Sequence, residues 1–158
     1  MKVLGVVCSP RKGGNTEIMM KEALAGASNY GAETELWTAA GKELKPCDAC
    51  GSCIKKKGKC HINDDMQELY PKILAADGLI FGSPSYFESV TAQAKIVIDR
   101  MHGLYNMFVL ANKVAGVVNI AASSGHEGAY APFRSFIRFC HMFPAEQAYG
   151  YAETRGEV

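Results

Sequence analysis

The sequence predicts a single doubly wound α/β domain, with helices on both faces of a five-stranded parallel sheet. Three observations indicate this class of fold. The chain has 158 residues, which suits one hydrophobic core. Short apolar segments alternate with amphipathic segments along the chain, and no internal repeat or linker-like stretch interrupts them. Strands that alternate with helices favour βαβ units, in which each parallel strand is reached through a crossover helix.

Five segments are predicted to form the strands. Residues 3–7, 79–81 and 114–121 are short apolar runs, as expected for strands that are buried on both faces. Residues 34–37 alternate polar and apolar side chains, which suits an edge strand. Residues 145–151 are assigned as the last strand.

Four helices are predicted between these strands, because apolar side chains recur three or four residues apart. The first helix covers residues 16–27. The second starts at Asp64, which has capping-box spacing to Gln67. The third and fourth present their apolar faces at residues 94–101 and 133–140.

Three loops follow buried strands and are the candidate ligand-binding segments. Open parallel sheets bind ligands beyond the carboxyl ends of their strands, where the strand order reverses. The loops at residues 8–16, 82–90 and 122–128 all leave a strand at that edge. We therefore expect these loops to contribute to one site.

The first of these loops has the composition of a phosphate-binding turn. Its small residues allow successive N–H groups to point inward, and the following helix adds the positive end of its dipole. The loop is not a P-loop, and it lacks the Gly-x-Gly-x-x-Gly pattern of dinucleotide sites. The alternative is an ordinary glycine-rich turn before a helix. The candidate phosphate ligands are Ser9, Arg11, Gly14, Asn15 and Thr16.

Residues 45–61 are predicted to form an inserted loop that carries four closely spaced cysteines. Cys47, Cys50, Cys53 and Cys60 follow the pattern C-x₂-C-x₂-C-x₆-C. Thiolates at this spacing converge only if the segment wraps around a common centre. The cysteine motif that binds an iron–sulfur cluster in bacterial ferredoxins begins with the same spacing. A structural zinc site and reduced thiols without a metal are the alternatives.

Composition and charge argue against several classes of partner. The formal net charge is +1, which gives no reason to expect nucleic acid or a membrane surface as a partner. No apolar stretch approaches the roughly 20 residues of a spanning helix, and the N-terminus lacks the pattern of a secretory signal. We expect a cytoplasmic protein, in which clustered cysteines serve as metal ligands or redox groups rather than disulfides.

Two motifs carry a resemblance to a known family. The sequence SPRKGGNT at residues 9–16 resembles the phosphate-binding signature of flavodoxin-like NAD(P)H-dependent FMN reductases, with Cys8 where their signature has glycine. Residues 77–87 resemble the flavin-ring segment of the same family, and residues 95–100 the helix that follows it. The resemblance implies a flavodoxin-like fold over residues 1–158, with strand order 2-1-3-4-5 and FMN as cofactor.

The resemblance also implies which residues contact the flavin ring. Pro84, Ser85, Tyr86 and Phe87 are expected at the ring, with Tyr86 or Phe87 covering its face or edge, and Ser124 adds a contact from the third loop. The alternative is that both aromatic residues belong to the core or to a subunit interface. No catalytic side chain is assigned, because a flavin accepts a hydride at its own N5 atom.

Within this family the sequence most resembles the iron–sulfur flavoproteins, whose compact four-cysteine motif binds one [4Fe-4S] cluster near the flavin of a neighbouring subunit. The resemblance implies a homodimer or a dimer of dimers, NAD(P)H as co-substrate, and a ferredoxin-like carrier that exchanges single electrons with the cluster. The implied function is an FMN-dependent oxidoreductase or electron-transfer flavoprotein. The alternatives are a plain FMN or quinone-type reductase without a cluster, and a flavin-free interaction domain.

Flavodoxin-like domains end with a helix after the fifth strand, and the sequence stops near that strand at Val158. Either a partner subunit covers the sheet or the sequence ends early.

Overall fold

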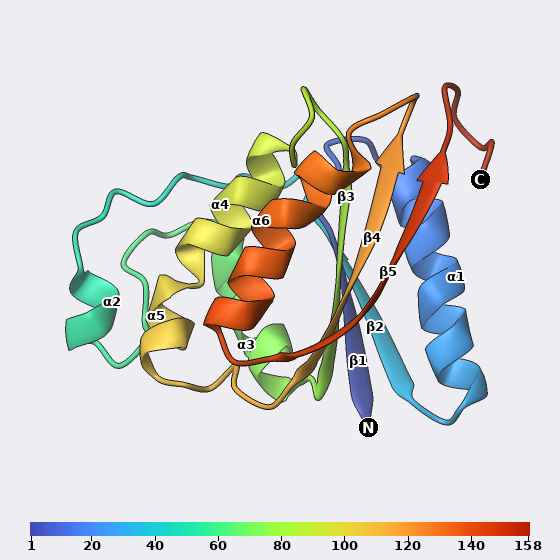
Figure 1. Cartoon of the computed structure of the whole chain (residues 1–158). Coiled ribbons are helices and arrows are strands. Elements are labelled where there is room, and N and C mark those ends of the chain that lie inside the picture. Colours follow the sequence, from blue (N-terminus) through green and yellow to red (C-terminus); the bar gives the residue numbers. More distant parts are fainter.

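A five-stranded parallel sheet organises the chain (Figure 1). The computed structural model describes residues 1–158. The strand order is β2-β1-β3-β4-β5, and every neighbouring pair is parallel, which confirms the predicted fold class and strand order. The strands are β1 (Lys2–Val7), β2 (Glu33–Thr38), β3 (Gly78–Pro84), β4 (Val114–Ala121) and β5 (Phe143–Tyr151).

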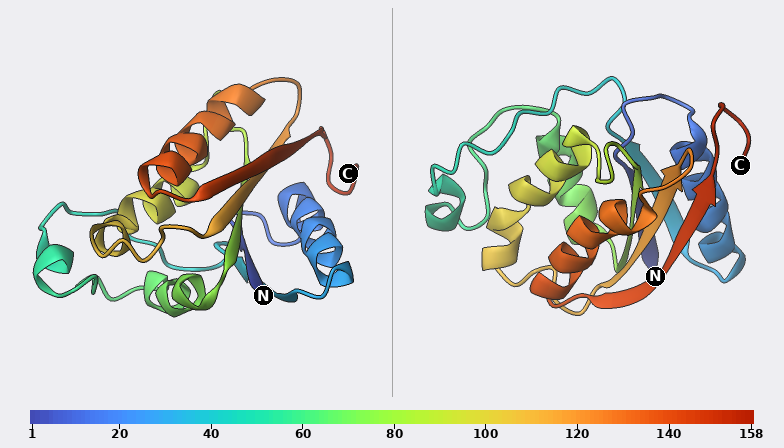
Figure 2. Two further views of the ribbon diagram at one scale, coloured as in Figure 1. Left: turned by 60° about the horizontal axis from the view of Figure 1, so that its bottom comes forward. Right: turned by 45° about the horizontal axis from the view of Figure 1, so that its top comes forward.

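The helices lie on both faces of this sheet. The first helix covers one face, and three others lie against the opposite face, as the views in Figures 1 and 2 agree. None of the helices has both the length and the hydropathy that crossing a membrane requires. The helices are α1 (Asn15–Asn29), α2 (Ser52–Lys55), α3 (Met66–Ala75), α4 (Ala92–Arg100), α5 (His102–Asn106) and α6 (His126–Phe139).

The hydrophobic core is divided unequally by the sheet. A cluster of 25 buried residues includes side chains of β1, β3, α3, α4 and α6, whereas a cluster of 6 joins the sheet to α1. Phe81 of β3 stacks on Phe133 of α6, with ring centroids 5.5 Å apart. Most of the buried apolar surface, and hence most of the hydrophobic stabilisation, therefore lies on the side of α3, α4 and α6.

Two local predictions need correction. The segment 45–61 is not loop throughout, because it contains the short helix α2. The capping box does not form, since α3 begins at Met66 and the Asp64 carboxylate accepts from the Met66 N–H at 3.2 Å rather than from the Gln67 N–H. The same carboxylate also accepts hydrogen bonds from the buried guanidinium of Arg100, and the Gln67 amide donates to the Ile62 carbonyl at 2.6 Å. A buried charge requires a counter-charge, and this requirement overrides the local capping pattern.

Candidate cofactor site and cysteine loop

All three predicted loops, the third through Ala122 alone, line one cavity at the carboxyl edge of the sheet together with the end of β4. The cavity has a volume of about 230 Å³. It therefore lies where an open parallel sheet is expected to bind a ligand. Eight of the predicted cofactor ligands line it, namely Ser9, Arg11, Gly14, Asn15, Thr16, Pro84, Ser85 and Tyr86.

The phosphate loop is shaped by its own side chains. The Ser9 hydroxyl accepts a hydrogen bond from the Arg11 N–H at 3.2 Å, and the Glu17 carboxylate accepts one from the Gly13 N–H at 2.7 Å. Gly13 has φ +62°, in the left-handed region that glycine adopts without steric cost. The pKa of Glu17 is lowered by its ion pair with Lys21 and by the Gly13 N–H. Glu17 is therefore ionised and holds the turn closed.

The start of α1 offers free hydrogen-bond donors to this cavity. Gly14 precedes the helix, and no side chain caps its first turn. The backbone N–H groups of Gly14, Asn15 and Thr16 donate to no acceptor within the chain. These unpaired N–H groups lie at the positive end of the helix dipole, and Arg11 lines the same cavity. Such donors and charges are suited to bind a phosphate monoester.

The ring segment forms a tight hairpin at the edge of the same cavity. Tyr86 and Ser89 exchange backbone hydrogen bonds of 2.8 and 3.1 Å. Between them, Phe87 has φ +49° and Glu88 has φ +58°, an uncommon conformation for residues with a Cβ atom. The Ser124 hydroxyl donates to the Glu88 carboxylate at 2.7 Å. Phe87 is fully exposed, and neither Phe87 nor Ser124 is among the residues that line the cavity.

The C-terminal segment lines the cavity as well, which the sequence pattern did not indicate. Residues 152–155 are part of its wall. The Asn15 side chain, predicted as a phosphate ligand, donates from Nδ2 to the Thr154 carbonyl at 2.7 Å and accepts from the Gly156 N–H at 2.6 Å. These contacts join residues about 140 positions apart, so they depend on the tertiary structure rather than on any local sequence pattern.

Helix α4 joins the cofactor cavity to the cysteine loop. At its N-terminal end the Thr91 hydroxyl donates to the Cys8 carbonyl at 2.6 Å and accepts from the Ala94 N–H. The Thr91 N–H donates to the Ser83 hydroxyl at 3.1 Å. The same helix ends at Arg100, whose side chain is buried at the base of the cysteine loop.

A buried ion pair closes the base of the cysteine loop. The Arg100 guanidinium donates two hydrogen bonds to the Asp64 carboxylate, at 2.7 and 3.0 Å, and a third to the Lys45 carbonyl at 2.8 Å. Both ionic side chains have no exposed surface. Burial alone would raise the pKa of Asp64, but the hydrogen bonds from Arg100 and from the Lys45 N–H outweigh it and hold the pKa below its ordinary value. The two ends of the loop are therefore fixed to α4.

Removing the charge of Asp64 should destabilise the protein strongly. We expect Asp64→Asn to lower the free energy of unfolding by about 3–5 kcal/mol, because the buried guanidinium of Arg100 loses its counter-charge. Urea denaturation measures this change. The matched control is Asp99→Asn, which removes an exposed carboxylate paired with Lys95 and should cost less than about 1 kcal/mol. Similar small losses for both variants would show that the buried pair does not hold the loop.

The cysteine loop packs closely against α5. A Cβ atom added at Gly103 would lie 2.6 Å from the Gly58 carbonyl oxygen and 3.0 Å from Cβ of Cys53. Glycine at position 103 thus permits the approach of the two backbones. Figures 1 and 2 show the loop, with α2, on the flank of the molecule that α5 occupies.

All the cysteine residues of the loop are free thiols that reach the surface in part or in full. Burial raises the pKa of Cys53, and the neighbouring thiols of Cys60 and Cys47 add to that rise. The donor set of four accessible thiols fits an iron–sulfur cluster, whose ligands are cysteine thiolates.

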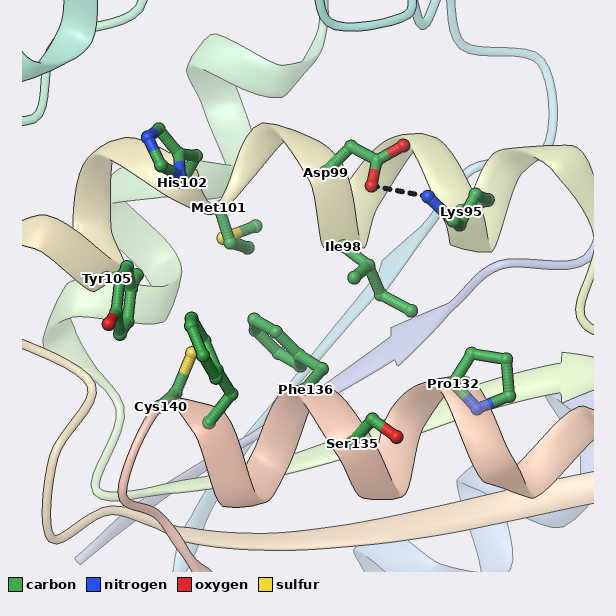
Figure 3. Close-up of a pocket in the computed structure, with 11 residues that line it drawn as sticks. Lys95, Ile98, Asp99, Met101, His102, Tyr105, Pro132, Ser135, Phe136 and Cys140 are labelled. Atoms are coloured by element: carbon green, nitrogen blue, oxygen red, sulfur yellow. Dashed lines mark hydrogen bonds and ion pairs between the residues drawn. The ribbon is translucent and has the colours of Figure 1, made fainter.

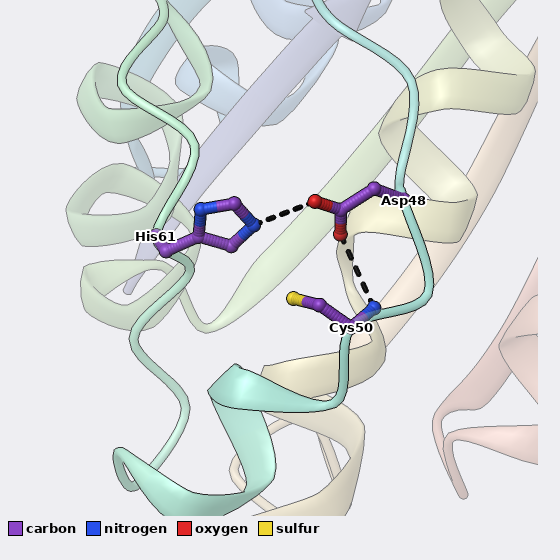
Figure 4. A group of neighbouring side chains, drawn as sticks. All are labelled: Asp48, Cys50 and His61. Atoms are coloured by element: carbon purple, nitrogen blue, oxygen red, sulfur yellow. Dashed lines mark hydrogen bonds and ion pairs between the residues drawn. The ribbon is translucent and has the colours of Figure 1, made fainter.

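An aspartate and a histidine adjoin one of these cysteines (Figure 4). The Asp48 carboxylate lies 2.8 Å from Nε2 of His61 and accepts from the Cys50 N–H at 3.2 Å. Hydrogen bonds from Cys50 and from His61 lower the pKa of Asp48 to about 2. The ligand atoms of all three exposed residues lie within 4.8 Å of one another. Asp48 therefore remains a carboxylate beside Cys50 at neutral pH.

Comparison with known proteins places the chain in a family. The family model of the NADPH-dependent FMN reductases matches residues 1–155. An iron-sulfur flavoprotein of Methanocaldococcus jannaschii is 48% identical over 139 residues, which cover 87% of this chain and 72% of that protein. An iron-sulfur flavoprotein of Archaeoglobus fulgidus is 35% identical over 159 residues, covering 100% of this chain and 72% of that protein.

Solved structures support the same fold. A flavone reductase superposes with a TM-score of 0.76 at 19% identity, covering 96% of this chain and 54% of its own. A flavodoxin, WrbA-like protein from Agrobacterium tumefaciens superposes with a TM-score of 0.69 at 17% identity, covering 98% of this chain and 85% of its own. By the match to the family model over nearly its whole length, the chain belongs to the NADPH-dependent FMN reductase family and is a flavin-dependent oxidoreductase.

Proposed function

We propose that the chain binds FMN in the cavity at the carboxyl edge of the sheet and exchanges electrons between FMN and a [4Fe-4S] cluster. The observation that carries the FMN site is the convergence of the free N–H groups of α1, Arg11 and the ring segment in this cavity. The phosphate loop would hold the FMN phosphate, and Pro84, Ser85 and Tyr86 would adjoin the flavin ring. Phe87 and Ser124 remain proposed ring contacts, which would need the hairpin that carries Phe87 and the loop that carries Ser124 to turn toward the cavity.

FMN, when it is bound, would supply the group that accepts the hydride. The chain's own residues fix the phosphate and thereby orient the ring at the mouth of the cavity. NAD(P)H is the proposed hydride donor, in keeping with the name of the family.

The proposed cluster ligands are Cys47, Cys50, Cys53 and Cys60. Support comes from the four free thiols in one loop and from relatives named iron-sulfur flavoproteins, one of them 48% identical. The cluster would allow exchange of single electrons with a ferredoxin-like carrier. Clustered free thiols also favour a reducing compartment, and we propose the cytoplasm.

Anaerobic purification followed by cofactor analysis tests the proposed function. We expect one FMN and about four irons per chain, with acid-labile sulfide and broad absorption in the violet-blue. Protein with FMN but no iron after anaerobic reconstitution would reduce the function to that of a plain flavin reductase. Protein that binds no FMN would reject the proposed cofactor site altogether.

We further propose that two copies associate through the face formed by α4, α5 and α6. A groove of about 430 Å³ lies between these helices, and Figure 3 shows Ile98 and Met101 facing Phe136 across it. Phe139, which also lines the groove, leaves 65% of its surface exposed. Exposed apolar patches of this kind mark protein interfaces.

Light scattering at micromolar concentration should give the mass of a homodimer, or of a dimer of dimers. Phe139→Glu should shift this mass toward the monomer, because it places a charge in the apolar groove. Tyr30→Glu changes an aromatic residue that is 94% exposed at the end of α1 and serves as the control. A monomeric mass for the unmodified chain would refute the association.

A further inference from the structure

The segment Ala152–Glu157, called the strap below, crosses the phosphate loop. Three hydrogen bonds attach it there. The Asn15 side chain bonds to the Thr154 carbonyl and the Gly156 N–H, and Nε of Arg155 donates to the Gly13 carbonyl at 2.9 Å. A Cβ atom added at Gly13 would lie 2.8 Å from an outer nitrogen of Arg155. The guanidinium of Arg155 therefore lies directly against the turn that is proposed to hold phosphate.

The strap has its own internal structure, which determines where Arg155 lies. The Glu157 carboxylate accepts hydrogen bonds from the Glu153 and Thr154 N–H groups, at 2.6 and 2.8 Å, and from the Thr154 hydroxyl at 2.5 Å. At its start, the Ala152 N–H donates to the Ala121 carbonyl of β4 at 3.0 Å. The strap is thus a closed turn tied to the sheet at one end and to Asn15 at the other.

Two guanidiniums line the cofactor cavity, and they come from opposite ends of the sequence. Arg11 belongs to the phosphate loop and Arg155 to the strap, and no other basic side chain is in the lining. Because Nε of Arg155 is used on Gly13, its two outer nitrogens remain free to donate to an anion. Glu153 is the one acidic residue in the lining. Because its negative charge would repel a bound phosphate dianion, both guanidiniums would be needed beside the dianion to offset that repulsion.

We propose that Arg155 is a second cationic ligand of the FMN phosphate and that the strap forms the outer wall of the phosphate site. The proposal rests on the proposed function, since it names a further ligand for the same cofactor. It also reassigns Asn15, whose side chain anchors the strap and is not available to the phosphate. Together with the phosphate loop, the strap thereby contributes to selectivity for a flavin with a 5′-phosphate over a flavin without one.

Titration of the deflavinated full chain with FMN and with riboflavin tests this inference. Arg155→Gln should weaken FMN binding about 10- to 100-fold, because a charge-assisted hydrogen bond is lost. Riboflavin affinity should be unchanged, since riboflavin has no phosphate. Arg155→Lys should recover part of the FMN affinity. Arg138→Gln, an exposed arginine of α6, is the control and should bind both flavins as the unmodified chain does.

The ratio of the two affinities separates this proposal from the function on which it rests. If the unmodified chain prefers FMN and Arg155→Gln keeps the whole of that preference, the role of Arg155 is overturned while the FMN site stands. An equal loss of affinity for both flavins in Arg155→Gln would also overturn the role of Arg155. The substitution would then have disturbed the fold rather than phosphate recognition. A chain that binds neither flavin refutes the proposed function together with this inference.

Discussion

Replacing Cys50 by Ser is expected to remove the iron from the protein and to leave FMN bound. A [4Fe-4S] cluster needs a thiolate at each of its four irons, and a serine hydroxyl is a poor substitute for one of them. Cys50 is exposed in the loop whose ends are bonded to Arg100, the last residue of α4, whereas the phosphate loop is bonded to Thr91 at the other end of that helix, so the loss of Cys50 should not disturb FMN binding. Hydride uptake from NAD(P)H should persist, whereas transfer of single electrons to a ferredoxin-like partner should stop.

Iron, sulfide and flavin content of the anaerobically purified variant measure this effect. The control is Cys140→Ala, because burial raises the pKa of Cys140 to about 11 and keeps it a neutral thiol. The control should retain about four irons per chain. One zinc per chain in the unmodified protein, bound for example beside Asp48 and His61, would instead contradict the cluster assignment.

The double replacement of Arg11 and Thr16 by Ala is expected to weaken FMN binding by about 2–4 kcal/mol, or about 30- to 900-fold in Kd. Arg11 contributes a charge to the cavity, and Thr16 lines it with a hydroxyl at the start of α1. Both groups would lose hydrogen bonds to a charged phosphate, which are stronger than bonds between neutral groups.

An equilibrium fluorescence titration with FMN measures this loss. Lys12→Ala is the matched control, because Lys12 belongs to the same loop but is not in the lining of the cavity. An unchanged FMN affinity in the double variant would place the phosphate elsewhere. A loss of equal size in Lys12→Ala would show that the loop acts only through its overall positive charge.

The fold could be predicted because its signals are local and repeated. Residues 3–7 and 114–121 are almost entirely apolar, Asn119 being the exception, because parallel strands are buried on both faces. The strand order required more than periodicity, and it came from the family resemblance of the two motifs. Helix α2 escaped prediction because four residues are too few to show a helical period.

The candidate site was predictable where one segment supplies both geometry and chemistry. The phosphate loop carries its glycines, its hydroxyls and its helix start within eight residues, 9–16. The strap could not be predicted, because Arg155 reaches the same cavity only through the pairing of β4 with β5. For the same reason, the role of Asn15 as an anchor and the pairing of Asp64 with Arg100 depend on tertiary contacts that local patterns do not record.

Helix α4 has a consequence for the motions of the two sites. Its first turn is bonded through Thr91 to the carbonyl of Cys8, and its last residue holds both ends of the cysteine loop. Nine residues of helix are about 13 Å long, so the loops at its two ends keep a nearly constant separation. Local opening at either end must break bonds to the same helix, which makes the two sites one cooperative unit of unfolding. The hydrogen-bonded amides of α4 should accordingly show a common free energy of opening in hydrogen exchange, rather than fray separately from each terminus.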